Sequence, residues 1–480
     1  MFLVVAQLLS IQRKKSAALR KDLLRQRGPT MIWREGDTPR TVSAYSTLTA
    51  APLPKPPKNE LNNKTARRTI SKNPDLFKVV SPIKSDVLEE NLKDHPNQSY
   101  VQSVVRGFKY GFWPFADTSD LPTTYDGSGQ RSGQRSPTIS KDRAKFIQQQ
   151  SKDEMDLDRW SKPFGDKLLP GMHASPISAV PKSTPGKFRL VNDQSRGPHS
   201  LNSTIAKNQV KVKLDTVHDL GSKLLAVRKK YPKRRLTSWK SDVKSAYRQL
   251  PVHPLWQIKQ AVRVDGRFHI DRCNSFGNRG GGWNWDRFIS LVNWIAIEKK
   301  GVSDLLGYVD DNFGWEFEGR TEYYKPYKKR MPTKQVQLLK LWDELGIPHE
   351  EDKQLSGPSL PILGYDVDAN KMTVKVPDKK KEKVVQLLRS NAKVGKPYTI
   401  NELQSAAGSV SSALSLYPEI RPSLGVLFDE MAKQKPGARK LTVTKDVAHT
   451  LSGLANFLEN APPVRIQEQK KSVRGTIKAR

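Results

Sequence analysis

The sequence predicts an α+β protein in which an antiparallel sheet carries helices on one face and is followed by an all-helical unit. Two observations support this class. From about residue 165, short β-prone runs alternate with turns and with amphipathic helical stretches. Beyond residue 378, the apolar residues recur at helical spacing only. We therefore expect a sheet-bearing unit at 165–377 and a helical unit at 378–432.

The remaining segments are predicted to be less regular. Residues 1–75 mix basic clusters with prolines and show little periodicity, which is typical of a disordered basic arm. Residues 76–164 contain a small aromatic element near 95–115 and then a linker rich in Gly, Ser, Thr and Pro. Residues 433–480 are expected to be the start of a further region with a basic tail.

The elements of the sheet-bearing unit can be assigned in order. The runs 177–180 and 188–191 are joined by Pro185-Gly186, which predicts a β-hairpin. A strand is expected at 236–242. The later spacing predicts an amphipathic helix closed by Gly301, two strands at 304–308 and 313–317 around a tight turn, and a helix that ends at Gly346.

The charge balance favours a polyanionic partner. The formal net charge is +35, from 83 Lys and Arg against 48 Asp and Glu. Each phosphate that such a protein neutralises releases a condensed counterion, so nucleic acid is the leading partner class. An anionic membrane is the rival, but no basic amphipathic stripe or lipidation motif supports it. A basic tail on an unrelated fold is the remaining alternative.

The single cysteine, Cys273, excludes an internal disulfide framework and a Cys-rich zinc site. This usage is compatible with a reducing compartment, cytoplasm or nucleus. The apolar run at residues 1–10 is too short for a membrane span and lacks the positive residues that precede a secretory signal. We therefore expect an intracellular protein that is not secreted and has no transmembrane segment.

Three carboxylates are the candidate catalytic residues. Asp310 and Asp311 lie side by side at the expected turn between two strands, where like charges repel each other. A hard divalent cation with oxygen ligands would remove this repulsion. Nucleotidyl transfer uses two such ions roughly 3.5–4 Å apart, which need a carboxylate from another strand. Asp242, at the end of the strand 236–242, is the candidate; a solvated turn is the alternative for the pair alone.

Two motifs resemble those of a known family. The run 241–247 (SDVKSAY) resembles the first palm motif of reverse transcriptases, Asp-x-x-x-Ala-aromatic, and the run 308–311 (YVDD) resembles their signature hairpin. Over about 165–430 the chain is similar to the reverse transcriptases of fungal and DIRS-like retroelements. The resemblance implies a right-hand polymerase, with fingers and palm at 165–377 and a thumb at 378–432. It also implies RNA-directed DNA polymerase activity with two Mg²⁺ or Mn²⁺ ions, acting on dNTPs and on an RNA or DNA template–primer.

The resemblance implies a role for each matching residue. Asp242 and Asp310 would bind both metals, with Asp311 in support and the Val243 carbonyl as a further ligand. Tyr247 would lie under the sugar of the incoming nucleotide and exclude a 2′-hydroxyl. A core aromatic is the alternative for Tyr247.

Further roles follow from segments outside these two motifs. The implied roles are Lys182 and Arg189 in gripping the triphosphate, Phe276 and Gly277 behind the incoming base, Lys353 as the general acid for pyrophosphate, and Leu363, Gly364 and Tyr365 as the primer grip. The lysine-rich run 379–383 would contact the primer–template backbone. Solvated surface positions are the alternative for the lysines and for Arg189.

One segment departs from the family pattern. Residues 276–283 read FGNRGGGW, where the family has Phe-Gly-Leu-x-x-Ala-Pro before a helix. Gly280, Gly281 and Gly282 replace the Ala-Pro, as a subfamily feature or as decay. Three hypotheses stay open: an active DNA polymerase, a degenerate nucleic-acid-binding remnant, and an RNA-templated RNA polymerase, which should lack a bulky residue at position 247. No ribonuclease H, protease, integrase or zinc-knuckle motif is visible.

Overall fold

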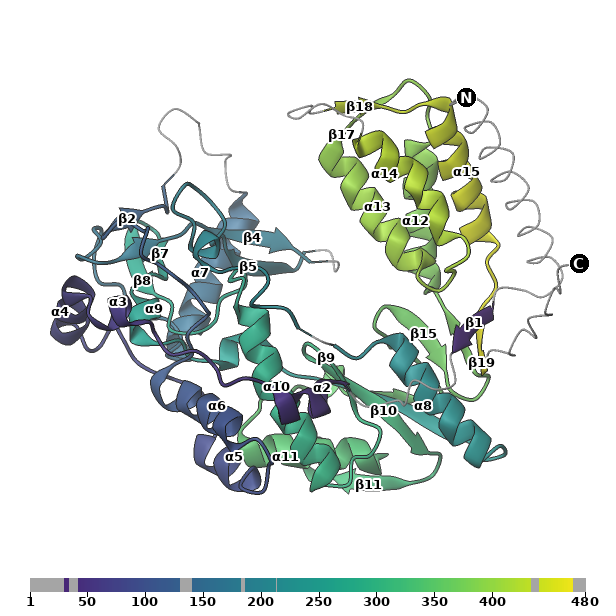
Figure 1. Cartoon of the computed structure of the whole chain (residues 1–480), viewed down its shortest axis with the longest axis horizontal. Coiled ribbons are helices and arrows are strands. Elements are labelled where there is room, and N and C mark those ends of the chain that lie inside the picture. Colours follow the sequence, from purple (N-terminus) through teal and green to yellow (C-terminus); the bar gives the residue numbers. More distant parts are fainter. Residues whose placement is uncertain are drawn as a thin grey trace, which may run out of the picture.

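The computed structural model describes residues 30–33, 42–129, 140–182, 186–212, 214–432 and 440–468 (Figure 1). At its centre lies a four-stranded sheet in the order β13-β6-β10-β9. Its strands are β6 (Leu236–Asp242), β9 (Leu306–Tyr308), β10 (Asp311–Phe317) and β13 (Leu355–Gly357). All pairings in this sheet are antiparallel, as predicted.

Both faces of the central sheet are covered. On one face, Trp239 belongs to a core that it shares with α10 (Gly281–Glu298) and α11 (Thr333–Leu345). On the other face, Phe313 belongs to a core shared with α8 (Val217–Lys230) and with a second sheet. The expectation of helices on one face only is therefore wrong, and β10 is accordingly buried at every position from 312 to 316.

A second group of elements, the hairpin lobe, is built around the antiparallel hairpin of β4 (Ile177–Pro181) and β5 (Phe188–Asn192). Its other members are α7 (Lys141–Asp156), α9 (Pro254–Gln257) and the sheet of β2 (Tyr125–Asp126), β3 (His173–Ala174), β7 (Ala261–Val264) and β8 (Arg267–Ile270). Because α7 packs against β4 and β5, it belongs to this lobe rather than to a linker. The predicted boundary at 165 is therefore too late, and residues 130–139 of the predicted linker lie outside the described residues.

The prediction of a disordered arm up to residue 75 is wrong for residues 42–75. This segment contains α2 (Val42–Tyr45), α3 (Lys58–Leu61) and α4 (Lys64–Lys72), and it leads into α5 (Ser85–Asn91) and α6 (Gln98–Tyr110). Helix α2 packs against α10, and α4 packs against α9. Ala44, Leu53 and Ala66 are each buried against other elements, but such isolated apolar residues produce no periodicity in the sequence. The rest of the predicted arm, apart from residues 30–33, lies outside the described residues.

The helical lobe contains α12 (Asp378–Asn391), α13 (Ile400–Leu414), α14 (Gly425–Ala432) and α15 (Lys445–Glu459), with a short hairpin of β17 (Pro397–Thr399) and β18 (Lys440–Thr442). Helix α15 packs along α12, so the predicted end of this unit at 432 is too early. Residues 469–480 of the predicted basic tail lie outside the described residues.

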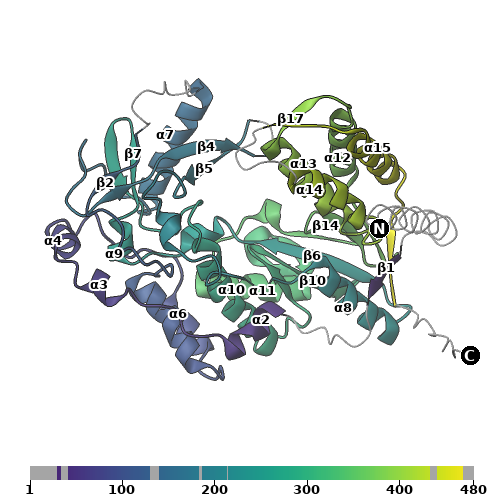
Figure 2. The same ribbon diagram turned by 45° about the horizontal axis from the view of Figure 1, so that its top comes forward.

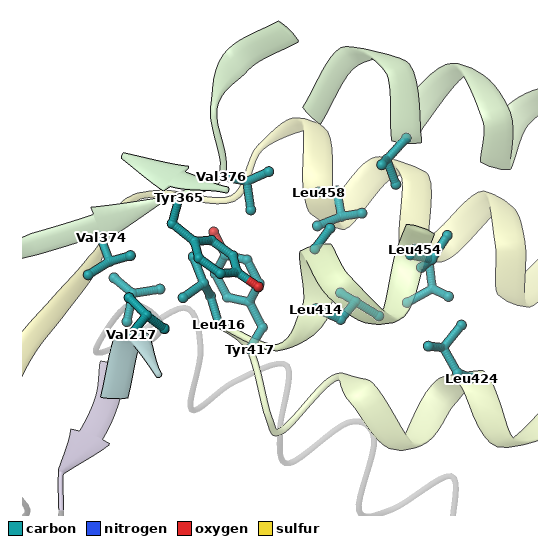
Figure 3. Close-up of a cluster of buried hydrophobic side chains, with 14 of the residues drawn as sticks. Val217, Tyr365, Val374, Val376, Leu414, Leu416, Tyr417, Leu424, Leu454 and Leu458 are labelled. Atoms are coloured by element: carbon teal, nitrogen blue, oxygen red, sulfur yellow. The ribbon is translucent and has the colours of Figure 1, made fainter. Parts of the chain in front are cut away.

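A five-stranded sheet supports the helical lobe. Its order is β1-β19-β16-β15-β14, with β1 (Thr30–Trp33), β14 (Ser359–Ile362), β15 (Tyr365–Asp368), β16 (Thr373–Lys375) and β19 (Val464–Glu468). Figure 3 shows part of the buried cluster that joins this sheet to the lobe: Tyr365 and Val374 of the sheet, and Val376 just after β16, belong to the same cluster as Leu414, Leu454 and Leu458. The lobe is therefore fixed to the sheet by a continuous apolar core.

The helical lobe and the hairpin lobe lie at opposite ends of the central sheet (Figures 1 and 2). Within the described ranges, the helices are all too short or too polar to span a bilayer.

Candidate active site

The three carboxylates meet at one edge of the central sheet. Strands β6 and β10 pair so that Asp311 lies directly opposite Asp242. In an antiparallel pair the Cα atoms of such partners are roughly 4.5–5.5 Å apart. The Val243 backbone N–H donates to the Asp310 carbonyl at 3.2 Å, which ties the strand end to the turn. Asp242 and Asp311, which are 69 positions apart in the sequence, are thus neighbours at this edge, as the expected convergence requires.

The turn between β9 and β10 holds Val309 in an unusual backbone conformation. Its φ is +57°, in the left-handed region that β-branched residues rarely adopt. Turns with positive φ at this first central position usually have glycine there. The indole N–H of Trp285 donates to the Val309 carbonyl at 2.6 Å and helps to hold the turn. Trp285 lies in α10, and its helical spacing in the sequence gives no signal of this contact.

The carboxylate edge is electrostatically strained. Burial, and then the charges of Asp242 and Asp311, raise the pKa of Asp310 above its usual value. No described side chain forms an ion pair with Asp310. Burial also raises the pKa of Asp311, although Lys240 opposes this shift from 2.9 Å. A partly buried carboxylate that forms no ion pair with any described residue is chemically suited to lie beside a cation.

Two lysines neutralise the other two carboxylates. Strand β13 pairs with β6 so that Leu355 faces Lys240, and the same register continued by two residues brings Lys353 opposite Asp242. The Lys353 Nζ lies 2.8 Å from Asp242 Oδ1. Burial would lower the pKa of Lys353, but this ion pair outweighs it and raises the pKa. Lys353, in the short 3₁₀ helix η5 (Glu351–Lys353) before β13, thus continues the row of Asp242 and Asp311 from the two adjacent strands.

These residues fit a hard metal ion by their chemistry, since carboxylate oxygens are the ligands that Mg²⁺ prefers. Their side chains are not yet arranged as a ligand set. Among the described residues, no three His, Cys, Asp or Glu side chains are placed to hold one ion together. Asp242 and Asp311 instead contact lysines. Binding of an ion therefore requires these carboxylates to exchange partners.

A cavity of about 390 Å³ opens beside this edge. It is lined by residues from both the central sheet and the hairpin lobe, among them Lys182, Arg189, Val243, Tyr247, Phe276, Asp310 and Lys353. The Arg189 guanidinium lies 5.1 Å from the centre of the Phe276 ring, which in turn lies 5.6 Å from the Tyr247 ring. The structure thus brings seven of the sequence-predicted site residues to one cavity.

The cavity has a cationic wall. Lys182 and Arg189 form no ion pair with any described residue. Burial, and then the charge of Arg189, lower the pKa of Lys182. Two neighbouring cations that repel each other in a partly buried site are stabilised by an anion with several oxygens. The charge of this wall is therefore suited to an anion.

Close packing explains why glycine occupies certain positions at the back of the cavity. A Cβ on Gly277, whose φ is +124°, would lie 1.9 Å from the Asn192 carbonyl oxygen. In the unexpected glycine run, a Cβ on Gly280 would lie 2.9 Å from Pro114, and one on Gly282 would lie 3.3 Å from the Tyr247 hydroxyl. Gly280 is thus required by its close neighbour, whereas a methyl group on Gly282 would make the Tyr247 ring move by a few tenths of an ångström.

A buried ion network lies below Tyr247. Arg248 Nη1 donates to both Asp271 carboxylate oxygens at 2.8 and 2.9 Å, and its Nη2 donates to Glu154 at 2.6 Å. Burial would lower the pKa of Arg248, but these two acids outweigh it and raise the pKa. The network joins Tyr247 and its neighbours to α7 and β8. Sequence reasoning missed it because the partners lie 94 and 23 positions away and make no motif.

The three residues predicted as a primer grip do not line the cavity. Leu363 and Gly364 form the turn between β14 and β15, with φ of +51° and +78°. The Tyr365 hydroxyl donates to the Ser412 carbonyl of α13 at 2.6 Å. Lys380 of α12 donates to the Gly364 carbonyl at 3.3 Å. This turn is therefore attached to the helical lobe.

Comparison with known proteins gives a distant likeness only. No family model matches the sequence, and no curated protein matches it. The chain is similar to a foamy viral protease-reverse transcriptase in complex with double-stranded DNA, at 17% identity and a TM-score of 0.47 over 82% of this chain and 64% of that chain. It is also similar to a foamy viral protease-reverse transcriptase in complex with an RNA/DNA hybrid, at 17% identity and a TM-score of 0.48 over 83% of this chain and 50% of that chain. The chain thus spans about two thirds and one half of the lengths of these two proteins, and a likeness at this level assigns no role to any residue.

Proposed function

We propose that this chain is the reverse transcriptase of a retrotransposon of the fungal or DIRS-like type, an RNA-directed DNA polymerase. The observation that carries the proposal is the strand register that sets Asp311 opposite Asp242, with Asp310 facing a cavity whose other wall is cationic. Carboxylates for metal ions and cations for phosphate oxygens, on opposite sides of one cavity, are what nucleotidyl transfer needs.

In this proposal the carboxylates bind metal ions and the cationic side chains bind the triphosphate. Asp242 and Asp310, with Asp311 and the Val243 carbonyl, would hold two Mg²⁺ or Mn²⁺ ions. When bound, such ions stabilise charge on the attacking and leaving oxygens. Lys182 and Arg189 would bind the triphosphate of a dNTP.

Two further side chains would set selectivity and proton transfer. Tyr247 would lie against the sugar, and Phe276 and Gly277 behind the base. Lys353 would give a proton to the leaving pyrophosphate, which it can do only after Asp242 has released it. Ion binding and the freeing of the acid are therefore coupled.

The template–primer would occupy the space between the lobes. The helical lobe is the proposed thumb and would contact the duplex through basic residues near 379–383. The turn at Leu363, Gly364 and Tyr365, attached to this lobe, is the proposed primer grip. The net charge of +35 supports binding to such a polyanion.

The decisive experiment is extension of a DNA primer on an RNA template by the purified chain, with Mg²⁺ or Mn²⁺. Asp310→Asn should lower incorporation by about a thousand-fold or more. Asp120→Asn, an exposed carboxylate outside the cavity, is the matched control and should extend normally. Unchanged extension by Asp310→Asn would rule out the proposed metal site. Salt-sensitive RNA binding without synthesis under either metal would instead identify a degenerate remnant.

The proposed role of Tyr247 separates DNA from RNA synthesis. Tyr247→Ala should gain ribonucleotide incorporation, because the smaller side chain leaves room for a 2′-hydroxyl. The same sugar preference in both proteins would contradict this role.

A further inference from the structure

Helices α3 and α4 form an ordered basic surface on the hairpin lobe, outside the cavity. Six exposed cations lie on this segment: Lys55, Lys58, Lys64, Arg67, Arg68 and Lys72. We infer that this surface, the α4 surface, binds the unpaired strand of the template ahead of the active site. The inference rests on the proposed function for the identity of that strand.

The α4 surface is firmly anchored. The Asn63 side chain caps α4 by accepting from the Ala66 N–H at 3.0 Å, and the Thr69 hydroxyl donates to the Pro170 carbonyl at 2.6 Å. In α3, Glu60 forms an ion pair with Lys259 at 3.4 Å, and both side chains are at most 5% exposed. A nine-residue helix is too short to be stable alone, so these contacts set its position.

The cations on the surface are not neutralised by the protein. None of the six forms an ion pair with an acid in the described ranges, and the one acid of the segment, Glu60, is turned inward to Lys259. Lys64, Arg68 and Lys72 follow one another at a spacing of four residues, and each such like-charge pair destabilises a helix by roughly 0.2–0.5 kcal/mol. No acid on α4 compensates for this. Helix stability therefore does not explain the charges, whereas an external polyanion does.

The position of the α4 surface favours the unpaired template strand as its ligand. Helices α3 and α4 lie at the end of the molecule beyond the hairpin lobe, while the helical lobe lies at the other end (Figures 1 and 2). If the duplex product leaves along the helical lobe, the unpaired template must approach from the hairpin lobe. Lys64, Arg68 and Lys72 are spaced roughly 6 Å apart along the helix axis, so one strand can contact several of them in turn.

The test compares two variants with the same loss of charge. Lys64→Gln/Arg68→Gln/Lys72→Gln alters the α4 surface, and Lys325→Gln/Lys328→Gln/Arg330→Gln alters exposed cations in β12 (Lys329–Pro332) and in the turn that joins it to β11 (Thr321–Tyr324). Binding is measured against salt concentration for primer–templates with no 5′ template overhang and with an overhang of about twelve nucleotides. Thermal unfolding of each variant confirms that it is folded.

Wild-type protein should bind the long overhang more tightly than the blunt substrate, and the α4 variant should lose this difference. Its slope of log affinity against log salt should fall by about 2 on the long overhang, the value for three contacts to a single strand. The β12 variant should keep both properties. Equal losses of binding in both variants would show that the effect depends on net charge alone. No loss in the α4 variant would leave another partner, such as an acidic protein, for the α4 surface. Either result overturns the inference. Failure of the wild type to incorporate nucleotides would contradict the proposed function, but the binding comparison between the two variants could still be interpreted.

Discussion

Two tight β-turns in this protein have opposite characters. The turn between β14 and β15 has positive φ at Leu363 and Gly364, and Tyr365 and Lys380 attach it to the helical lobe. The turn between β9 and β10 has positive φ at Val309, a β-branched residue, and carries Asp310, which forms no ion pair with any described residue. Both turns thus hold a bulky residue at positive φ, but the second also carries unbalanced charge.

The difference shows where the chain gives up stability. Strain of this kind is kept only where surrounding structure holds it, and it is concentrated at sites that act on a ligand. At Val309 the holding groups are Trp285 and the pairing of β9 with β10. Under the proposed function, a cation bound at this edge would balance the charge of the second turn, whereas contacts within the protein hold the first turn.

The largest expected effect is at Asp310. Without divalent ions at pH 7, Asp310→Asn should raise the free energy of unfolding; with Mg²⁺ or Mn²⁺ present, it should lower incorporation by about a thousand-fold or more. Burial raises the pKa of Asp310 in the folded chain, so the charged carboxylate lowers the free energy of unfolding at neutral pH. This cost shrinks as the pH falls through the folded-state pKa and is gone below the unfolded-state pKa of about 3.9. Denaturant unfolding in a chelator, from pH 7 to pH 4, should show a gain that shrinks with acidity. A loss of stability at pH 7 would break the comparison.

The next effect concerns Lys353. Lys353→Met should bind Mn²⁺ more tightly than wild type, because Asp242 loses the cation that competes with the ion. It should also lower single-turnover incorporation by about a hundred-fold, the usual range for loss of a general acid. Calorimetric titration with Mn²⁺ and rapid-quench kinetics measure the two effects. Lys328→Met is the control, and weaker Mn²⁺ binding by Lys353→Met would contradict the proposed competition.

A smaller effect is expected at Gly282. A methyl group there would lie 3.3 Å from the Tyr247 hydroxyl and displace the ring by a few tenths of an ångström, whereas the nearest atom to a Cβ on Gly281 is at 3.7 Å. Gly282→Ala should therefore change the ratio of dNTP to rNTP incorporation by about five-fold, or roughly 1 kcal/mol. Gly281→Ala should change it much less. Equal ratios in the two variants would show that Gly282 does not position Tyr247.

The smallest effects test the turns themselves. Gly364→Ala should lower the free energy of unfolding by about 1 kcal/mol, because alanine disfavours its φ of +78°. Val309→Gly should raise it by up to about 1 kcal/mol, since relief of roughly 1–3 kcal/mol of strain exceeds the entropy cost of glycine, roughly 0.5–1 kcal/mol. Chemical denaturation measures both. Destabilisation by both variants would mean that the two turns are equally relaxed.

The sequence predicts the parts of the site that local patterns encode. Asp242 ends a strand-like run and Asp310 and Asp311 sit between two others, so their meeting follows from the strand order. The contacts that tune the site are not local. Lys240 reaches Asp311 diagonally across a strand pair, and Trp285 reaches Val309 from a helix.

The fold shows the same division. The hairpin of β4 and β5 follows from two short β-prone runs and the turn chemistry of Pro185-Gly186 between them. Residues 42–75 were not predicted to be ordered, because their few apolar residues are buried one at a time by distant elements. Glu60 illustrates this point. Its ion-pair partner, Lys259, lies almost 200 positions away, so no local sequence pattern could predict the pairing.

The path of the chain through the five-stranded sheet limits how the helical lobe can move. The chain leaves this sheet at β16, builds the lobe and returns as β19, which pairs with β16 on one side and with β1 on the other. The lobe is thus attached at two adjacent points, so it can rock about that seam but cannot swing freely. A chain shortened before residue 464 would lack β19 and therefore both its pairing with β16 and its pairing with β1. The lobe would then be attached to the sheet by one connection.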